Sequence, residues 1–165
     1  MNVTLTRNRK VAVAGVLVVL AIGAVVAYPI FAPKPTTQVN EAAMAGAQTL
    51  AQGTFQGAGD GIHQASGRVL LQRDGGSYYL RFEDYEATSG PDVFFYLTST
   101  ADARTTQQVE SGLRVLVPGG SDGGEATLRG SFNVPLPADF DPARYRGLAI
   151  WCDQFDTLFG SAALA

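Results

Sequence analysis

The 165-residue chain has very few residues of the types that form disulfides and metal sites: one cysteine, Cys152, and one histidine, His63. A single thiol cannot form an internal disulfide. Cys152 is therefore a small core residue, a pairing partner for another molecule, or a reactive thiolate or ligand. A structural zinc site usually takes four Cys or His ligands, which this inventory cannot supply. A Cys-x-x-Cys-His haem attachment motif is also missing, so any haem would be held noncovalently.

Clustered basic residues are absent beyond Lys34. The whole chain has a net charge of −3, and the segment through Ala32 contributes +3, so the remainder carries −6. Binding to phosphate backbones requires clustered Lys and Arg, so we expect no nucleic-acid partner. Long helical periods are also missing after the N-terminal segment. A parallel α/β sheet, which needs crossover connections of about a dozen residues or more, is therefore disfavoured.

The N-terminal segment is the one long apolar run. Residues 1–10 form a basic tail containing Arg7, Arg9 and Lys10, and residues 11–32 are uncharged and almost wholly apolar. A hydrocarbon core takes about 20 apolar residues as a helix, so residues 11–32 are predicted to be a transmembrane helix that anchors the protein in the membrane. Because the basic side normally stays cytoplasmic, we expect a single-pass cell-membrane protein with a cytoplasmic N-terminus and an extracytoplasmic C-terminal domain.

A cleaved signal peptide is the alternative interpretation of this run. The small residues Val25 and Ala27 stand three and one before a potential cut ahead of Tyr28. The apolar run is longer than the usual signal-peptide core of about 7–15 residues, which favours a retained anchor. Prolines at positions 29, 33 and 35 are expected to stop the helix.

The remainder divides into a linker and one domain. Residues 33–49 are rich in Pro, Thr, Gln, Asn and Ala and poor in large apolar residues, which predicts a linker or stalk with a short helix over 41–50. Residues 50–165 match one small domain in length. Short β-branched and aromatic runs alternate there with Gly, Asp and Ser clusters, which predicts an all-β fold, an antiparallel β-sandwich of about seven strands. The expected strands are 53–56, 64–73, 77–82, 92–98, 112–117, 126–134 and 147–152.

Cys152 ends the last of these strands. Period-2 alternation places it on the face of Leu148 and Ile150, and places Trp151 and Asp153 on the opposite face. A buried thiol that packs as a small hydrophobe is the simplest interpretation. Burial and the neighbouring carboxylate of Asp153 would both oppose a thiolate, so the local sequence gives no reason for a nucleophilic cysteine.

His63 lies in a glycine-rich approach to a strand. Together with Cys152 it could ligate a metal or haem, or it could be a hydrogen-bonding histidine at a turn. Cys152, His63 and Asp60 also satisfy a catalytic triad by inventory, but most domains contain these residue types, so a hydrolase or transferase is disfavoured.

Several segments, in order, resemble the extracytoplasmic DM-thirteen domain family. They are Gly53-Thr54-Phe55, His63 to Leu71, Leu80 to Tyr85, Gly90-Pro91-Asp92 with Val93 to Leu97, Ile150-Trp151-Cys152-Asp153-Gln154-Phe155, and Phe159 to Leu164. The Gly-Pro-Asp segment and the terminal Trp-Cys-x-x-Phe are the specific part. The resemblance implies a proposed role in electron transfer, with Cys152 as a free redox thiol or a ligand of a prosthetic group such as haem. Cys152, His63 and Trp151 are then the candidate cofactor-binding residues, although the sequence requires no cofactor.

Two functions follow as hypotheses. The first is a membrane-anchored extracytoplasmic electron-transfer or redox module that acts through Cys152 with an extracytoplasmic redox partner protein. The alternative is a non-catalytic β-sandwich binding or scaffold module at the cell surface, in which Cys152 only packs. Either is a module rather than a stand-alone enzyme.

Overall fold

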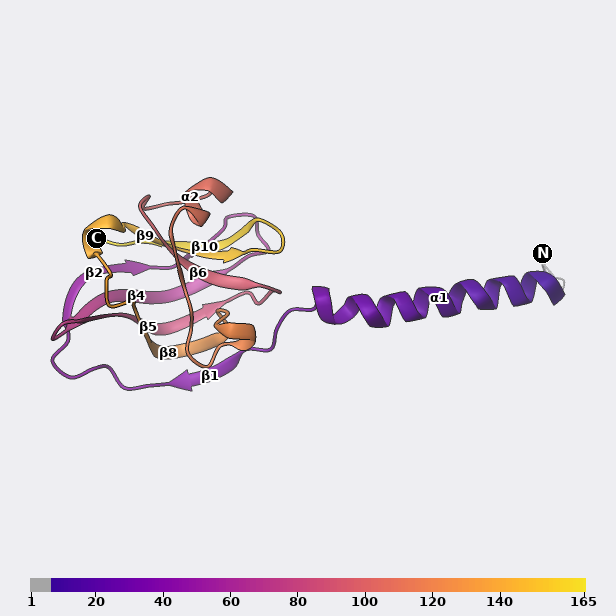
Figure 1. Cartoon of the computed structure of the whole chain (residues 1–165), viewed down its shortest axis with the longest axis horizontal. Coiled ribbons are helices and arrows are strands. Elements are labelled where there is room, and N and C mark those ends of the chain that lie inside the picture. The colour runs from indigo at the N-terminus through magenta and orange to yellow at the C-terminus, as the bar shows by residue number, and fades with distance from the viewer. Residues whose placement is uncertain (1–6) are drawn as a thin grey trace. The chain divides into compact units, whose positions relative to one another are not determined.

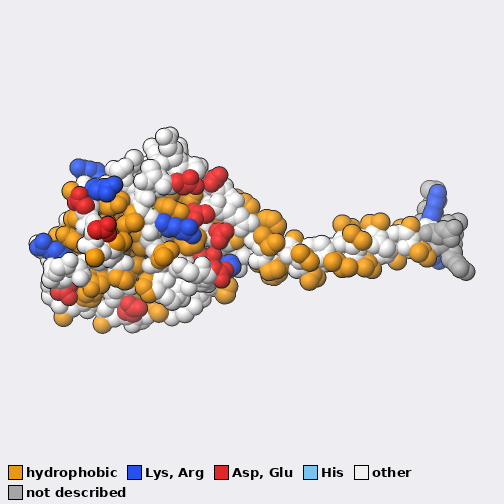
Figure 2. Space-filling view, in the orientation of Figure 1, with side chains coloured by type: hydrophobic (Ala, Val, Ile, Leu, Met, Phe, Trp, Pro, Cys, Tyr) orange, Lys and Arg blue, Asp and Glu red, His pale blue; other side chains and the backbone are white. Residues whose placement is uncertain are grey.

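The computed structural model describes residues 7–165 and divides the chain into two units, one ending at Ala32 and the other running from Pro33 to Ala165 (Figure 1). Residues 1–6 of the expected basic tail lie outside the described residues. The first unit is the helix α1, Arg7–Phe31. Its portion Arg9–Phe31 is long and apolar enough to cross a membrane, a property that an N-terminal signal sequence shares. Hydrophobic side chains cover it in Figure 2.

The limits of α1 differ from the expected 11–32 at both ends. The helix already begins within the basic segment, because Arg and Lys are good helix formers. Pro29 lies inside the last turn instead of ending the helix. A proline removes only one helical hydrogen bond, and a helical bond is still made beyond it, from the Ala32 amide to the Tyr28 carbonyl at 2.8 Å.

The second unit is a β-sandwich of two five-stranded sheets, which confirms the predicted fold class. The first sheet has the order β1 (Thr37–Asn40), β8 (Leu128–Pro135), β5 (Ser77–Ala87), β4 (Ala65–Asp74), β2 (Gln48–Thr54). The second has the order β3 (Gln56–Gly57), β10 (Thr157–Ala163), β9 (Gly147–Cys152), β6 (Val93–Thr98), β7 (Leu113–Val115). There are also a short helix α2 (Thr106–Glu110) and two 3-10 turns, η1 (Ser121–Gly123) and η2 (Pro142–Arg144). The strands number ten instead of about seven, and the β1–β8 pair is parallel.

The segment expected as a linker contains part of the sandwich. Thr37–Asn40 forms β1, which pairs with β8 so that Thr37 lies opposite Leu128. No helix forms over 41–50, and β2 begins there, at Gln48. Tertiary contacts override helix propensity here. The Glu41 carboxylate accepts hydrogen bonds from the Asn133 amide at 2.8 Å and from its side chain at 3.1 Å, and Arg81 donates to the Glu41 carbonyl at 2.9 Å.

The hydrophobic core lies between the two sheets. Its centre is a group of aromatic rings packed at centroid distances of 4.5–6.0 Å: Phe55, Phe82, Tyr85, Phe95 and Phe132. Phe55 stands where the chain passes from β2 in one sheet to β3 in the other, so this residue joins the sheets at their common edge. Charged side chains of both signs are mixed over the visible face of the domain (Figure 2).

A second apolar cluster lies on the outer face of the second sheet. It contains Phe94, Tyr96, Ala103, Val109, Ala149 and Trp151. The helix α2, begun by a capping box at Thr105, contributes the buried Val109 to this cluster. Both faces of β6 and β9 are consequently buried.

Candidate functional site

Cys152 is the last residue of β9 and lies opposite Val93 of β6 and Thr157 of β10. Its side chain is fully buried in the main core with Leu148 and Ile150, on the face that alternation predicted. The Cys152 thiol donates a hydrogen bond to the Pro91 carbonyl oxygen, with Sγ and O 3.0 Å apart. Cys152 is thus an enclosed thiol with a defined hydrogen-bond partner.

The electrostatic surroundings keep this thiol protonated. Burial is the main cause that raises the pKa of Cys152, and the carboxylates of Asp92 and Asp153 raise it further, while backbone amides of Phe155 and Gln154 act in the opposite direction. The nucleophilic form of a cysteine is the thiolate. Cys152 in this environment is therefore unsuited to nucleophilic attack.

The loop that accepts the thiol hydrogen bond is itself tightly held. A Cβ atom on Gly90 would lie 2.7 Å from Cζ of the buried Phe159 ring, so only glycine fits there without a shift. The Asp153 amide donates to the Asp92 carbonyl at 2.9 Å, which fixes the end of β9 to the same loop. Pro91 is fixed from both sides.

His63 lies at the same end of the sandwich, in the loop before β4. Its Nδ1 is 2.5 Å from Oδ2 of Asp60, and the other oxygen of Asp60 accepts from the backbone amides of Ile62 and His63 at 2.9 and 2.8 Å. These hydrogen bonds lower the pKa of Asp60 to about 2. The largest cause is the hydrogen bond from the His63 backbone amide. The His63 ring packs on Phe159 with 4.1 Å between centroids.

The described contacts join His63 to Cys152 only in series, through Phe159 and the Gly90-Pro91 loop. The Cys152 thiol donates to a backbone carbonyl and not to His63, so these residues and Asp60 do not form a catalytic triad. Within residues 7–165, no three His, Cys, Asp or Glu side chains gather as a metal site.

A haem ligated by both Cys152 and His63 does not fit this arrangement. The Cys152 sulfur is completely enclosed by core side chains and already hydrogen-bonded, so no coordination position is open at it. The Phe159 ring, 5% exposed, covers one face of the His63 ring. A planar macrocycle would have to displace the centre of this end of the core.

Trp151 faces away from Cys152, into the outer cluster. It is 2% exposed, and in the described part of the chain its indole Nε1 finds no hydrogen-bond acceptor. Its cross-strand neighbours are Phe94 on β6 and Leu158 on β10. The three residues predicted as cofactor ligands, Cys152, His63 and Trp151, therefore lie in three different environments and not around one cavity.

One polar group that sequence reasoning missed lies beside Trp151. The Tyr96 phenol donates to the carboxylate of Asp153, at 2.9 Å from Oδ1 and 3.0 Å from Oδ2. Nη1 of Arg114 is 3.5 Å from the same carboxylate, and the Arg114 guanidinium lies 3.4 Å from the centroid of the Phe94 ring. Alternation in β6 and β9 could have placed Tyr96 on the same face as Trp151. It could not have shown that the partner of Tyr96 is Asp153, in the turn after β9.

A second missed group is Glu125, which is completely buried. Neither carboxylate oxygen has a hydrogen-bond partner among the residues described. Burial raises the pKa of Glu125; Lys34 opposes the rise, and Asp122 and Asp92 add to it. Lys34 in turn pairs with Asp122. A glutamate in a loop gives no sequence signal of such burial.

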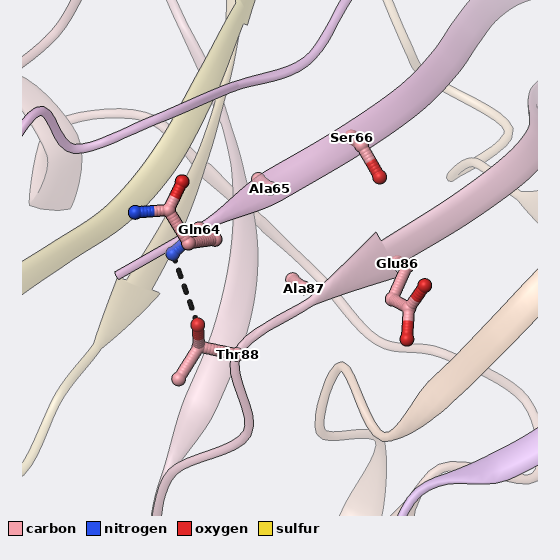
Figure 3. A pocket seen from close by; sticks show the side chains of 6 residues that line it. All are labelled: Gln64, Ala65, Ser66, Glu86, Ala87 and Thr88. Carbon is pink, nitrogen blue, oxygen red and sulfur yellow. Dashed lines mark hydrogen bonds between the residues drawn. The ribbon is translucent and has the colours of Figure 1, made fainter. Parts of the chain in front are cut away.

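A surface pocket of about 380 Å³ lies at the beginning of β4 and the end of β5 (Figure 3). Its lining residues are Gln64, Ala65, Ser66, Glu86, Ala87 and Thr88, and the Gln64 amide donates to the Thr88 hydroxyl at 2.9 Å. Ser66 and Glu86 stand opposite each other on the two strands. The lining includes one carboxylate and no cysteine or histidine, so it offers no assembled catalytic group.

Comparison with known protein families places most of the β-sandwich in one of them. The family model described as Electron transfer DM13 matches residues 55–164, about two thirds of the chain. The chain belongs to the DM13 family. The family membership expected from the sequence is thereby confirmed. The DM13 match spans His63, Tyr96, Trp151 and Cys152 and begins after β2, so it leaves out α1, β1 and β2. No curated protein and no solved structure matches the chain.

Proposed function

We propose that this DM13 chain is a membrane-anchored, extracytoplasmic electron-transfer domain that works through Cys152 and exchanges electrons with an extracytoplasmic redox partner protein. The family description supports electron transfer, and α1 supports an anchor. The observation that supports the role of Cys152 is its enclosed thiol, which is hydrogen-bonded to the Pro91 carbonyl. Cys152 ends β9, a strand that is buried on both faces.

This environment favours one kind of thiol chemistry over others. Disulfide exchange requires a thiolate that reaches a partner sulfur, and metal ligation requires an open position at sulfur. Cys152 offers neither. Electrons, in contrast, pass through packed protein, so electron transfer needs no exposed sulfur. Enclosure also protects a lone thiol from irreversible oxidation in an oxidising compartment.

Electron exchange can be tested on the full chain in detergent. Spectroscopic titration of the reduced protein with one-electron acceptors should show that the Cys152 thiol gives up one electron and its proton, leaving a thiyl radical, and that Cys152→Ala gives up correspondingly fewer electrons. Val69→Ala is the matched control, because Val69 is equally buried, on β4 of the other sheet. Equal electron loss from the natural protein and Cys152→Ala would refute a role for the thiol.

Anchoring is tested separately. A retained anchor predicts that the protein stays in the membrane pellet after alkaline carbonate extraction, that residues 33–165 alone do not, and that a protease outside the cell degrades the domain. A mature protein whose N-terminal residue is Tyr28 would instead establish a cleaved signal peptide.

The burial of Cys152 also favours a second function, a β-sandwich binding module in which the cysteine is structural. In that case Cys152→Ser would lower stability and leave partner binding intact in the folded fraction. The electron-transfer proposal predicts the opposite for activity: folded Cys152→Ser protein is inactive.

A further inference from the structure

The outer face of β6 and β9 brings together a tyrosine and a carboxylate beside the strand that ends in Cys152. Tyr96 is 6% exposed, and its phenol is hydrogen-bonded to both oxygens of Asp153. The Asp153 side chain is 26% exposed and the Arg114 side chain 45%, so this pair lies where buried residues reach the surface.

A second buried tyrosine gives a direct contrast. Tyr85 is 2% exposed in the main core, and its phenol oxygen has no hydrogen-bond partner anywhere in residues 7–165. An oxidised phenol is a strong acid and must release its proton, so a buried tyrosine, which cannot release it to water, is easily oxidised only where a base is within hydrogen-bond reach. Tyr96 meets this condition, and Tyr85 does not.

Asp153 is suited to accept that proton. Burial raises the pKa of Asp153, although the Tyr96 hydrogen bond and the Arg114 charge act against the rise; Asp92 and Asp156 add to it. Arg114 is held over the Phe94 ring by a cation–π contact, which positions its charge beside the carboxylate. The tyrosine, the base and the cation thus form one ordered group.

The same cluster leads towards Cys152. Tyr96 and Trp151 belong to one buried cluster, in which Tyr96 stands opposite Ala149 and Phe94 opposite Trp151. Trp151 precedes Cys152 directly in β9. Packed oxidisable side chains therefore run from the partly exposed Asp153 to the backbone of the cysteine.

We propose that Tyr96 is a one-electron relay of this domain, with Asp153 as its proton acceptor; this inference rests on the proposed electron-transfer function. In the oxidising step one electron leaves the Tyr96 ring for a one-electron acceptor, and the phenolic proton moves to the Asp153 carboxylate. The products are a neutral phenoxyl radical, a neutral carboxylic acid and an acceptor reduced by one electron. A one-electron donor reverses both transfers: the electron returns to the ring and Asp153 returns the proton.

The relay is tested by flash oxidation of the full chain in detergent, with photogenerated ruthenium(III) tris-bipyridine as the one-electron oxidant. Phenoxyl radical is followed by transient absorption and by electron paramagnetic resonance. The natural protein and Tyr85→Phe should give the same radical signal, and Tyr96→Phe should lose the share that Tyr96 supplies, since exposed tyrosines such as Tyr28 contribute the remainder. Asp153→Asn should slow radical formation about 100-fold, the scale of a positioned general base. Deuterated water should slow the natural protein as well.

A radical signal that Tyr96→Phe leaves unchanged would overturn the relay. So would equal rates in Asp153→Asn and the natural protein, which keeps the test decisive should Tyr96→Phe fail to fold. The titration of Cys152→Ala reports separately on the proposed function. Electron loss that depends on Cys152 but not on Tyr96 defeats the relay alone. A Tyr96 radical in a protein whose electron loss is the same with and without Cys152 defeats the thiol role alone.

Discussion

The Cys152 thiol donates its hydrogen bond to the Pro91 carbonyl oxygen, 61 positions earlier in the chain, over 3.0 Å. This contact connects the end of β9 with the loop that leads into β6. The Pro91 carbonyl is a backbone acceptor in this loop, and Cys152 supplies its donor. A substitution that removes the Cys152 thiol therefore also removes a contact that holds this loop against β9.

The first prediction concerns thiol accessibility. The folded protein should not react with a thiol reagent such as Ellman's reagent, because the sulfur is completely buried. One equivalent should react after denaturation with guanidinium chloride, since the chain has one cysteine. Rapid labelling of the folded protein would contradict the structure at this residue.

The second prediction concerns stability. Cys152→Ala should lower the free energy of unfolding by about 1–3 kcal/mol, because it leaves a small cavity and an unpaired Pro91 carbonyl. Cys152→Ser keeps a donor for that carbonyl, so its free energy of unfolding should differ from that of Cys152→Ala by the contribution of this hydrogen bond. Urea denaturation of both variants measures the contributions; a Cys152→Ala protein as stable as the natural one would show that the contact is dispensable.

The third prediction concerns the contact between Gly90 and Phe159. Gly90→Ala should destabilise the fold by about 1–3 kcal/mol, since the added Cβ would press on the Phe159 ring and, through it, on His63. Phe159→Leu should relieve part of this cost. A double-mutant cycle by thermal denaturation measures the coupling, and strictly additive effects would rule the contact out.

The fourth prediction uses the lowered pKa of Asp60. Because the folded-state pKa, about 2, lies below the ordinary value of 3.8, Asp60 stabilises the fold above pH 4 and loses this effect as pH falls towards 2. The stability difference between the natural protein and Asp60→Asn should therefore shrink between pH 4 and 2. Asp139→Asn, at an exposed position, is the control. A difference independent of pH would contradict the His63–Asp60 hydrogen bond.

The fifth prediction uses the raised pKa of buried Glu125. A carboxyl whose pKa is raised by folding favours the folded state at low pH and loses that contribution as pH rises above its ordinary value of 4.5. Glu125→Gln cannot ionise, so its stability relative to the natural protein should increase between pH 4 and 8. Lys34→Gln removes the nearby positive charge and should make the natural loss of stability with pH steeper. If the natural protein and Glu125→Gln showed the same dependence of stability on pH, the Glu125 carboxyl would have to be exposed to solvent.

The β-sandwich could be predicted from the sequence because its signals are local. Alternation put Cys152 with Leu148 and Ile150, and the expected strands 64–73 and 77–82 correspond to β4 and β5. The strand β1 could not be predicted in this way. Its four residues are mostly polar and are held by backbone pairing to β8, 91 positions later in the chain, which leaves no hydrophobic pattern.

The candidate site was only partly predictable for a similar reason. Residue types and the family resemblance identified Cys152, His63 and Trp151, and alternation placed Trp151 and Cys152 on opposite faces of their strand. That both faces of this strand are buried was not predicted. The Tyr96–Asp153 hydrogen bond joins residues 57 positions apart. Distances of this kind depend on strand register, which the sequence leaves open.

The edges of the two sheets determine how this domain behaves among copies of itself. Three of the four edge strands, β1, β3 and β7, have only four, two and three residues. The longer edge, β2, is capped at Gln52, which exchanges backbone hydrogen bonds of 2.9 and 3.0 Å with Ala165. Short or capped edges give a neighbouring chain little backbone to pair with. A crowded population of these domains should therefore resist aggregation by strand addition.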